Sequence, residues 1–362
     1  MAKIMTSSNS GVEGASGYSF QRCCVVFLIF EDFEKLSSES YFICLEHHED
    51  FLFAFLDEKG DLKKVDTYQA KKSRDDWEID SDFCEIIGKM ISVGKELLKD
   101  DHPKSSKYNH TLRFLTNKNI SLKSKRKAKQ KQQIIKVQVS NKSARYSDLH
   151  QEIKTNIESR ISETILDQAQ LENIEFHYID LPQSYKGWQR VLTGLSNEHF
   201  GSSINDHEAI ISTLMRLLQE IEQTYNDNNV VLLSDKSKRL TQTKIKETFE
   251  MFTESKKSFD FWRKYSEKLS EELDIKLPIR RKAKELLENC FDYFKDIQQI
   301  EYRKIYQFVK NRTDIDEQHN SETNCIIDLY HCYRNEYSPR LENHMIAFAV
   351  IAAYVETRGM YA

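Results

Sequence analysis

Long hydrophobic runs and a secretion signal are both missing from this sequence of 362 residues. Its two longest apolar stretches, Val25–Phe30 and Met345–Val355, are shorter than the roughly 20 residues that a membrane-spanning helix needs. The N-terminus shows no apolar segment followed by the small residues of a cleavage site. We therefore expect a folded, cytoplasmic protein with no membrane partner, long enough for two domains.

Paired cysteines are lacking as well. The seven cysteines are scattered along the chain, and no two of them form a CxxC pair. Neither a zinc ribbon nor a disulfide framework is therefore expected. Most of the cysteines are predicted to be reduced and buried as small hydrophobic side chains.

Glycine is scarce in the second half of the chain. None of the ten glycines lies between Gly201 and Gly359, and such a stretch is typical of helices. We expect residues 204–362 to form an all-α domain that regulates the rest of the chain or makes it assemble into a homo-oligomer.

Three helices can be placed in this domain from their apolar residues. Ile210–Ile221 repeats apolar residues at a spacing of three to four, and a longer apolar stripe from Leu286 to Phe308 predicts a second helix after Pro278. The run Met345–Val355 is apolar on all sides, which predicts a helix buried in a bundle or an interface. Aromatic residues of the region fit a core or a partner interface: Phe259, Phe261, Trp262, Tyr265, Phe291, Tyr293 and Phe294.

The first 203 residues follow a different pattern, in which short β-branched and aromatic runs alternate with turn signals and helical segments. Helices are expected over Tyr18–Leu36 and Ser81–Lys99, and a hairpin loop over Asp57–Asp61. This pattern predicts an α/β domain. Its expected strands are Tyr41–Glu46, Phe51–Leu56, Lys64–Lys71, Thr111–Thr116, Ile134–Ser140 and Ile174–Ile179.

The net charge of −4 conceals a strongly basic segment. Between Asp101 and His150, 13 lysines and arginines stand against two acidic residues, a local charge of +11. A run of this kind can bind nucleic-acid phosphates, or it can be a solvated loop, and both interpretations remain open. The densest part comprises Lys123, Lys125, Arg126, Lys127, Lys129 and Lys131.

The predicted hairpin carries groups suited to phosphodiester hydrolysis, which needs a divalent cation held by oxygen ligands and a polar group beside the attacking water. Asp50 stands at the head of one strand, and Gln69 and Lys71 lie two residues apart, hence on one face of the next. We expect Asp50, Gln69 and the backbone carbonyl of Ala70 to bind Mg²⁺ or Mn²⁺. Lys71 would orient the water and stabilise charge on the phosphate.

The Q-x-K triplet is weak evidence by itself, because Gln242-Thr243-Lys244 repeats it in the region expected to be helical. The hypothesis depends on the order of elements: a helix, an acidic strand end, a hairpin, the Q-x-K strand and a second helix. The alternative to a nuclease site is a sheet whose charged edge is simply solvated.

Two segments carry a resemblance to a known family. Glu46–Asp50 and Tyr68–Lys71, preceded by Gly17–Gln21 at the opening of a helix, resemble the PD-(D/E)xK nuclease domain of bacterial anti-phage effectors. That domain occurs in the CBASS endonuclease, in the nuclease subunit of Lamassu systems and beside HerA-type ATPases. The resemblance covers residues 1–203 and implies a restriction-endonuclease-like fold.

The resemblance also assigns roles to residues. It makes Asp50 the metal-binding aspartate, Lys71 the catalytic lysine and Glu46 an upstream acid. Gln69 stands where a glutamate is commoner, so Glu46 or Glu49 would supply the second carboxylate.

The function implied by this resemblance is metal-dependent cleavage of double-stranded DNA, although an RNA substrate would use the same residues. An unregulated nuclease would be lethal, and residues 204–362 lack the α/β pattern of a cyclic-oligonucleotide sensor. We therefore expect a partner to hold the chain inactive, with an SMC-like ATPase complex of Lamassu type favoured over a HerA-type ATPase. The alternative is a catalytically silent subunit that binds nucleic acid or scaffolds a HerA-type complex.

Overall fold

The computed structural model describes residues 10–47, 49–126, 131–224 and 233–359. The chain divides into two compact units. The sheet unit comprises Met1–His199 and His207–Lys246, and the helical unit comprises Phe200–Asp206 and Glu247–Ala362. This division differs from the boundary after residue 203 that the sequence suggested, because the helix after His207 packs with the sheet unit.

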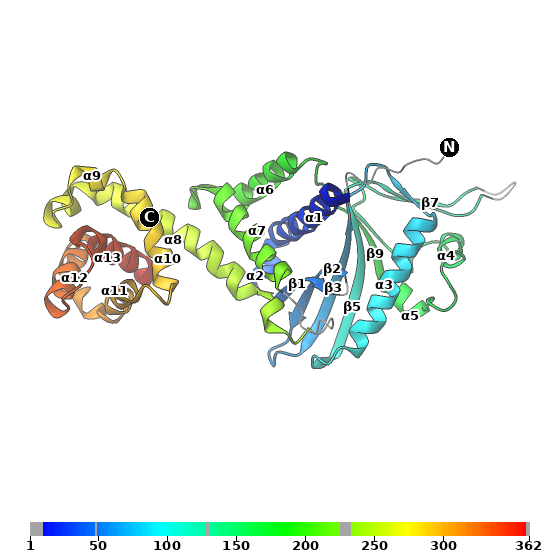
Figure 1. Cartoon of the computed structure of the whole chain (residues 1–362), viewed down its shortest axis with the longest axis horizontal. Coiled ribbons are helices and arrows are strands. Elements are labelled where there is room, and N and C mark those ends of the chain that lie inside the picture. Colours follow the sequence, from blue (N-terminus) through cyan, green and yellow to red (C-terminus); the bar gives the residue numbers. More distant parts are fainter. Residues whose placement is uncertain (1–9, 48, 127–130, 225–232, 360–362) are drawn as a thin grey trace. The chain divides into compact units, whose positions relative to one another are not determined.

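A seven-stranded mixed sheet, in the order β10-β1-β2-β3-β5-β9-β8, forms the centre of the sheet unit (Figure 1). The pairs β1–β2 and β2–β3 are antiparallel, whereas β3–β5 and β5–β9 are parallel. The strands are β1 (Tyr41–His47), β2 (Glu49–Leu56), β3 (Leu62–Lys71), β5 (Lys104–Thr116), β8 (Ser143–Arg145), β9 (Ile174–Tyr178) and β10 (Leu240–Thr241).

The turn between β2 and β3 fixes the register of this hairpin. The Asp57 carboxylate accepts the backbone N–H groups of Lys59 at 2.9 Å and Asp61 at 3.0 Å, and Gly60 takes a φ of 86° that favours glycine. In the resulting register Phe51 pairs with Tyr68. The turn chemistry therefore determines which residues of the two strands meet at the far end, where β2 begins and β3 finishes.

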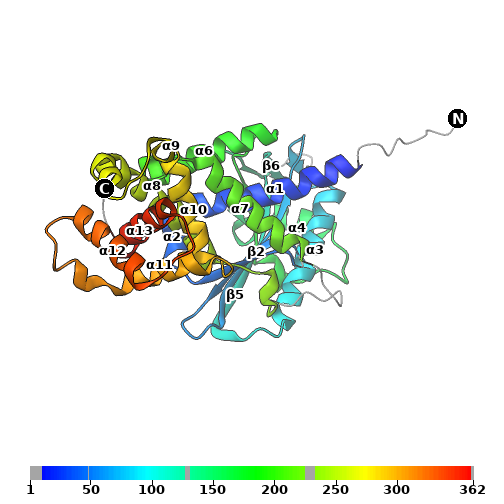
Figure 2. The same ribbon diagram turned by 60° about the vertical axis from the view of Figure 1, so that its left-hand side comes forward.

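Helices cover both faces of the main sheet. Helix α3 (Ser81–Lys99) begins at the N-cap Asp80, whose carboxylate accepts the Phe83 N–H at 2.9 Å, and it packs on the face that carries Leu52 and Val65. Helix α1 (Ser10–Glu31) lies on the opposite face, and α7 packs against α1 (Figure 2). The other helices of this unit are α2 (Phe33–Ser37), α4 (Gln151–Glu158), α5 (Gln168–Leu171), α6 (Tyr185–Phe200) and α7 (His207–Gln223).

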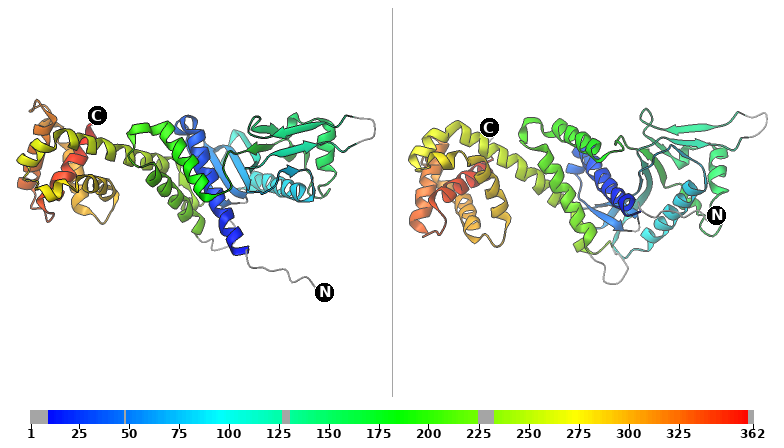
Figure 3. Two further views of the ribbon diagram at one scale, coloured as in Figure 1. Left: turned by 90° about the horizontal axis from the view of Figure 1, so that it is seen from above. Right: turned by 45° about the horizontal axis from the view of Figure 1, so that its top comes forward.

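A second, three-stranded sheet in the order β4-β6-β7 joins the main sheet where β3 and β5 end. It consists of β4 (Trp77–Glu78), β6 (Ile120–Lys123) and β7 (Ile134–Val137). The indole N–H of Trp77 donates to Thr116 Oγ1 at 3.1 Å and ties the two sheets together. The antiparallel pair β6–β7 extends away from the main sheet (Figure 3).

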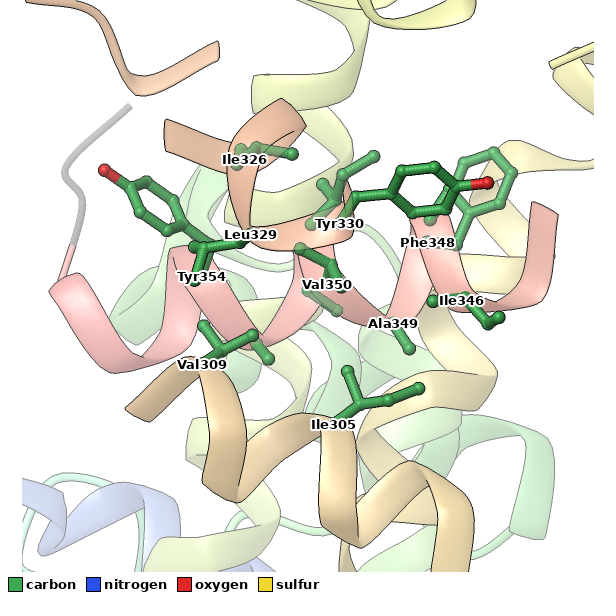
Figure 4. Packing of buried hydrophobic residues seen from close by; sticks show 14 of the residues in the cluster. Ile305, Val309, Ile326, Leu329, Tyr330, Ile346, Phe348, Ala349, Val350 and Tyr354 are labelled. Atoms are coloured by element: carbon green, nitrogen blue, oxygen red, sulfur yellow. The ribbon is translucent and has the colours of Figure 1, made fainter. Parts of the chain in front are cut away.

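The helical unit is built around α13 (Asn343–Arg358), whose residues from Ile346 to Val355 are all buried. Ile305 of α11 and Leu329 of α12 point toward α13 from different sides (Figure 4). The prediction of a helix buried in a bundle is thus confirmed. The surrounding helices are α8 (Gln242–Glu272), which starts in the sheet unit, α9 (Leu277–Arg280), α10 (Ala283–Lys295), α11 (Ile300–Asn311) and α12 (Glu322–Glu336).

The apolar stripe from Leu286 to Phe308 does not form one helix, so that prediction was wrong. It is divided between α10 and α11, because the Asp296 carboxylate accepts the Gln298 N–H at 2.8 Å in a turn. Ile297, expected on the stripe, is 78% exposed.

The general prediction of an α/β region followed by a helical region is confirmed. Among the helices that the structure describes, none is both long and apolar enough to cross a membrane.

Candidate active site

Asp50 and Lys71 meet at the end of the β2–β3 hairpin. The Asp50 carboxylate Oδ2 lies 3.7 Å from Lys71 Nζ and accepts the backbone N–H of Ala70 at 2.7 Å. The Asp50 side chain is 14% exposed and the Lys71 side chain 35%. The carboxylate is therefore fixed and largely shielded, while the ammonium group remains open to solvent and to a substrate.

The predicted side chains of β3 converge on Asp50. Gln69 and Lys71 lie two residues apart on β3 and therefore share a face, and both reach the Asp50 carboxylate at the start of β2. Gln69 is buried, and its side-chain amide hydrogen-bonds the Asp50 carboxylate. The structure thus brings together the three side chains that the sequence singled out.

The backbone of Ala70 also faces this point. A residue in a strand directs its N–H and its C=O toward the same neighbouring strand, and the Ala70 N–H already reaches Asp50 of β2. Its carbonyl oxygen is therefore directed toward the same strand end, as the metal-ligand hypothesis requires.

Glu46 stands opposite Asp50 in the β1–β2 register, between the pairs Leu45↔Phe51 and His47↔Glu49. Its φ of 52° lies in the left-handed region, which costs a non-glycine residue on the order of 1–3 kcal/mol and is concentrated at functional sites. Burial of part of the carboxyl group, and the negative charges of Asp50 and Glu222, raise the pKa of Glu46. The side chain of Glu49, the other predicted second carboxylate, lies outside the described residues.

Gln21 is a site residue that was not predicted to have a role, although it closes the Gly17–Gln21 segment that carries part of the resemblance. It comes from α1, is 9% exposed, and its side-chain amide hydrogen-bonds both the Asp50 and the Glu46 carboxylates. Its Oε1 atom is buried without a hydrogen-bond partner among the described residues. The available signal was its position as a polar residue at the start of the long apolar stretch of α1.

The electrostatics of the two central carboxyl groups oppose their ionisation. Burial raises the pKa of Asp50, although Lys71, Gln69 and the Ala70 N–H act in the opposite direction. The negative charge of Asp50 also raises the pKa of Glu46. A bound cation would relieve this repulsion.

The oxygen atoms gathered here fit a hard divalent cation. Carboxylates from Asp50 and Glu46, the Gln69 amide and the Ala70 carbonyl are ligand types that Mg²⁺ and Mn²⁺ prefer. The unpartnered Gln21 Oε1 is a further acceptor that a cation or its water could satisfy. Within the described residues no three His, Cys, Asp or Glu side chains form a metal site, so amide and carbonyl oxygens together with water would complete any such shell.

The predicted basic run lies on and beyond β6, in the second sheet. Lys123 Nζ is 2.6 Å from Glu78 Oε1, and Lys125 Nζ donates to Ser159 Oγ at 2.9 Å. Arg126 and Lys131 are exposed. The remaining two members of the run, Lys127 and Lys129, lie outside the described residues.

A shielded aspartate, two amides and a half-exposed lysine at one strand end are the group types that the nuclease hypothesis expects. Residues 9–239 match the family described as Cap4, dsDNA endonuclease domain. Because this match covers more than half of the chain, the chain belongs to that family. The resemblance to nuclease domains of bacterial anti-phage effectors is thereby confirmed. No curated protein and no solved structure matches the sequence.

Proposed function

We propose that this chain is a metal-dependent endonuclease that cleaves double-stranded DNA as an effector of anti-phage defence. The observation that carries the proposal is the convergence of Asp50 and Lys71, whose charged atoms lie 3.7 Å apart at the end of a hairpin. Membership of the Cap4 dsDNA endonuclease family supports the choice of DNA over RNA. The order of α1, the β1–β3 meander, α3 and the parallel strands β5 and β9 supports a restriction-endonuclease-like fold for the sheet unit.

One group of residues would bind the cation, and Lys71 would act on the water and the phosphate. Asp50, Gln69, Glu46 and the Ala70 carbonyl would hold Mg²⁺ or Mn²⁺, which when bound supplies Lewis-acid stabilisation of the phosphate and acidifies its water. Lys71 places its ammonium beside the Asp50 carboxylate, where it can orient the attacking water and stabilise negative charge on the phosphate.

The β6–β7 pair would contribute to DNA binding. The pair leaves the main sheet next to the strand ends where the candidate site lies, because Lys71 pairs with Thr116 just before the chain enters β6. Arg126 and Lys131, which are exposed between β6 and β7 in the sequence, suit a phosphate backbone, whose attraction depends on charge and not on sequence.

The helical unit would connect the nuclease to its regulator. We favour an SMC-like ATPase complex of Lamassu type as the partner, with a HerA-type ATPase as the second candidate and a homo-oligomer as the working form. A helical unit with its own core, centred on α13, is a suitable rigid platform for such contacts.

The experiment is a plasmid-cleavage assay with the full chain, alone and with each candidate partner complex, in Mg²⁺, in Mn²⁺ and in a chelator. We expect cleavage with either cation and none with the chelator. DNA binding without cleavage under every condition would favour the alternative, a catalytically silent nucleic-acid-binding or scaffold subunit.

A further inference from the structure

A cavity of about 220 Å³, partly open to solvent, lies within the sheet unit and is lined by α1, α6 and α7. Leu192, Ile211 and Met215 give it apolar walls, and the ring of Tyr185 stands at its side. None of the residues assigned to the candidate active site lines it. The nuclease mechanism therefore leaves this cavity without a role.

The charged side chains that line the cavity are Arg22, Arg216 and Glu208, which together carry a net charge of +1. Arg22 is the only lysine or arginine in α1, its side chain is 14% exposed, and it forms an ion pair with Glu222 of α7. Arg216 is 71% exposed, with its guanidinium 3.9 Å from Glu220. A planar guanidinium is well matched to a phosphate group, and the neighbouring apolar walls suit a flat ring.

Helix α1 connects the cavity to the candidate active site. Gln21 hydrogen-bonds the Asp50 and Glu46 carboxylates, while the next residue, Arg22, lines the cavity and pairs with Glu222. A ligand that draws the Arg22 guanidinium toward itself must disturb this pairing of α1 with α7. The adjacent Gln21 would then shift against the carboxylates that it orients.

Helix α6 makes a second connection. Tyr185 lines the cavity and contacts Trp188 with ring centroids 5.9 Å apart. The Trp188 ring lies 5.0 Å from Lys72 Nζ, and Lys72 directly follows Lys71. The Gln183 side chain, just before α6, donates to the Ser73 carbonyl at 2.7 Å. Movement of α6 would therefore reach the residues next to the catalytic lysine.

We infer that this cavity binds a small amphipathic anion of the nucleoside monophosphate class and that its occupation slows cleavage. A volume of about 220 Å³ lies below the roughly 300–1,000 Å³ of sites for drug-sized ligands. It therefore limits the ligand to a single nucleotide, with its base at the apolar walls and its phosphate at the arginines. The binding step is independent of the proposed function, whereas the effect on cleavage rests on it. A misplacement of about 1 Å in such a centre can reduce a rate on the order of a hundredfold.

The test is titration calorimetry of the full chain with the four nucleoside 5′-monophosphates, with the corresponding nucleosides and with inorganic phosphate. We expect at least one monophosphate to bind at least tenfold more tightly than its nucleoside and than phosphate. Met215→Trp, which fills the cavity from a half-buried position, should abolish this binding. Leu98→Trp, at a site on α3 that is 54% exposed, should leave it unchanged.

Cleavage is then measured with and without the monophosphate that binds. We expect this monophosphate to slow cleavage by the wild type at least fivefold and to leave the cleavage rate of the Met215→Trp protein unchanged. Absence of binding by every probe, equal binding of inorganic phosphate, or binding retained in Met215→Trp would each overturn the site. Binding with an unchanged cleavage rate would overturn the coupling. A chain that binds the ligand but cleaves nothing would contradict the proposed function while leaving the site standing.

Discussion

At the scale of single residues, the site depends on carboxylates that are held in place at an energetic cost. Asp50 is shielded and its pKa is raised mainly by burial, and Glu46 adopts a φ of 52° beside it. Such features destabilise a fold and are typical of functional centres. Gln21 partly offsets the cost, because its amide bridges the two carboxylates.

The role of Gln21 can be measured directly. Gln21→Ala removes the hydrogen bonds that orient Asp50 and Glu46, so we expect cleavage to slow by about tenfold to a hundredfold and the Mg²⁺ requirement to rise. Gln168→Ala, at an exposed position on α5, is the matched control. An unaltered Mg²⁺ requirement in Gln21→Ala would show that this amide does not orient the ligands.

The raised pKa of Asp50 makes a prediction for stability. A carboxyl group whose pKa is raised by folding lowers the free energy of unfolding when it is ionised. This penalty is fully present above the pKa of the folded state, and it is absent below the ordinary pKa of aspartate. Asp50→Asn keeps the oxygen that accepts the Ala70 N–H but never ionises. Its Tm in chelator should exceed that of the wild type at neutral pH, and the difference should vanish in acid. A lower Tm at neutral pH would contradict this assignment.

At the scale of elements, the hairpin β2–β3 and the pair β6–β7 serve different purposes. The first is held by its turn and its core, which fix the register of the candidate ligands. The second carries exposed cationic side chains beyond the main sheet. Catalysis and substrate affinity should therefore respond to separate mutations.

Neutralising the exposed cations beside β6 should weaken DNA binding without affecting the centre. For the triple change Lys125→Gln, Arg126→Gln and Lys131→Gln, we expect the slope of log K against log salt to fall by about one for each lost phosphate contact. Lys123 is left intact because it is paired with Glu78.

The matched control for this experiment changes three exposed lysines outside the β6–β7 pair to glutamine: Lys89, Lys99 and Lys276. An unchanged salt slope in the first triple variant would remove the basic run from the DNA-binding surface.

Much of the element pattern was predictable from the sequence. Apolar, β-branched and aromatic runs located β1, β2, β3 and α13, because burial on both faces of a strand or on all sides of a helix leaves a nearly continuous apolar stretch. The two-residue strands β4 and β10 carry no such pattern, and they exist only through their neighbours in the sheet. The separation of α10 from α11 depends on a side-chain turn at Asp296, which apolar periodicity alone overlooks.

Only the part of the site that lies on the β2–β3 hairpin was predictable from the sequence. Asp50, Gln69 and Lys71 lie on neighbouring strands whose register follows from a local turn. Gln21 reaches the site from α1, and Glu222 influences Glu46 from α7, 200 positions after its partner Arg22. Contacts of that separation arise from tertiary packing, which a single sequence does not reveal.

At the scale of the whole molecule, two separate hydrophobic clusters support the two units. One contains α13 and its neighbours, and the other lies between α3 and the main sheet. The candidate ligands all belong to the sheet unit. A cation should therefore stabilise one unit directly and the other only through coupling.

Calorimetric unfolding tests this separation. We expect two transitions, of which Mg²⁺ raises only that of the sheet unit. Ala349→Phe overpacks the fully buried centre of α13 and should lower the other transition, at a cost of about 1–3 kcal/mol. Ile297→Ala, at an exposed position of the same unit, should shift neither transition. A single transition that Mg²⁺ and Ala349→Phe both move would show that the units unfold together.

The most direct test of the account is the single-turnover rate of plasmid cleavage in Mg²⁺ by Lys71→Ala, compared with the wild type and with Lys99→Ala, whose lysine is 72% exposed on α3. Removing the ammonium that lies 3.7 Å from Asp50 should slow cleavage at least about a hundredfold, with DNA affinity and Tm little changed, while Lys99→Ala should match the wild type. Cleavage by Lys71→Ala at the wild-type rate would contradict the assignment of this strand end as the active site.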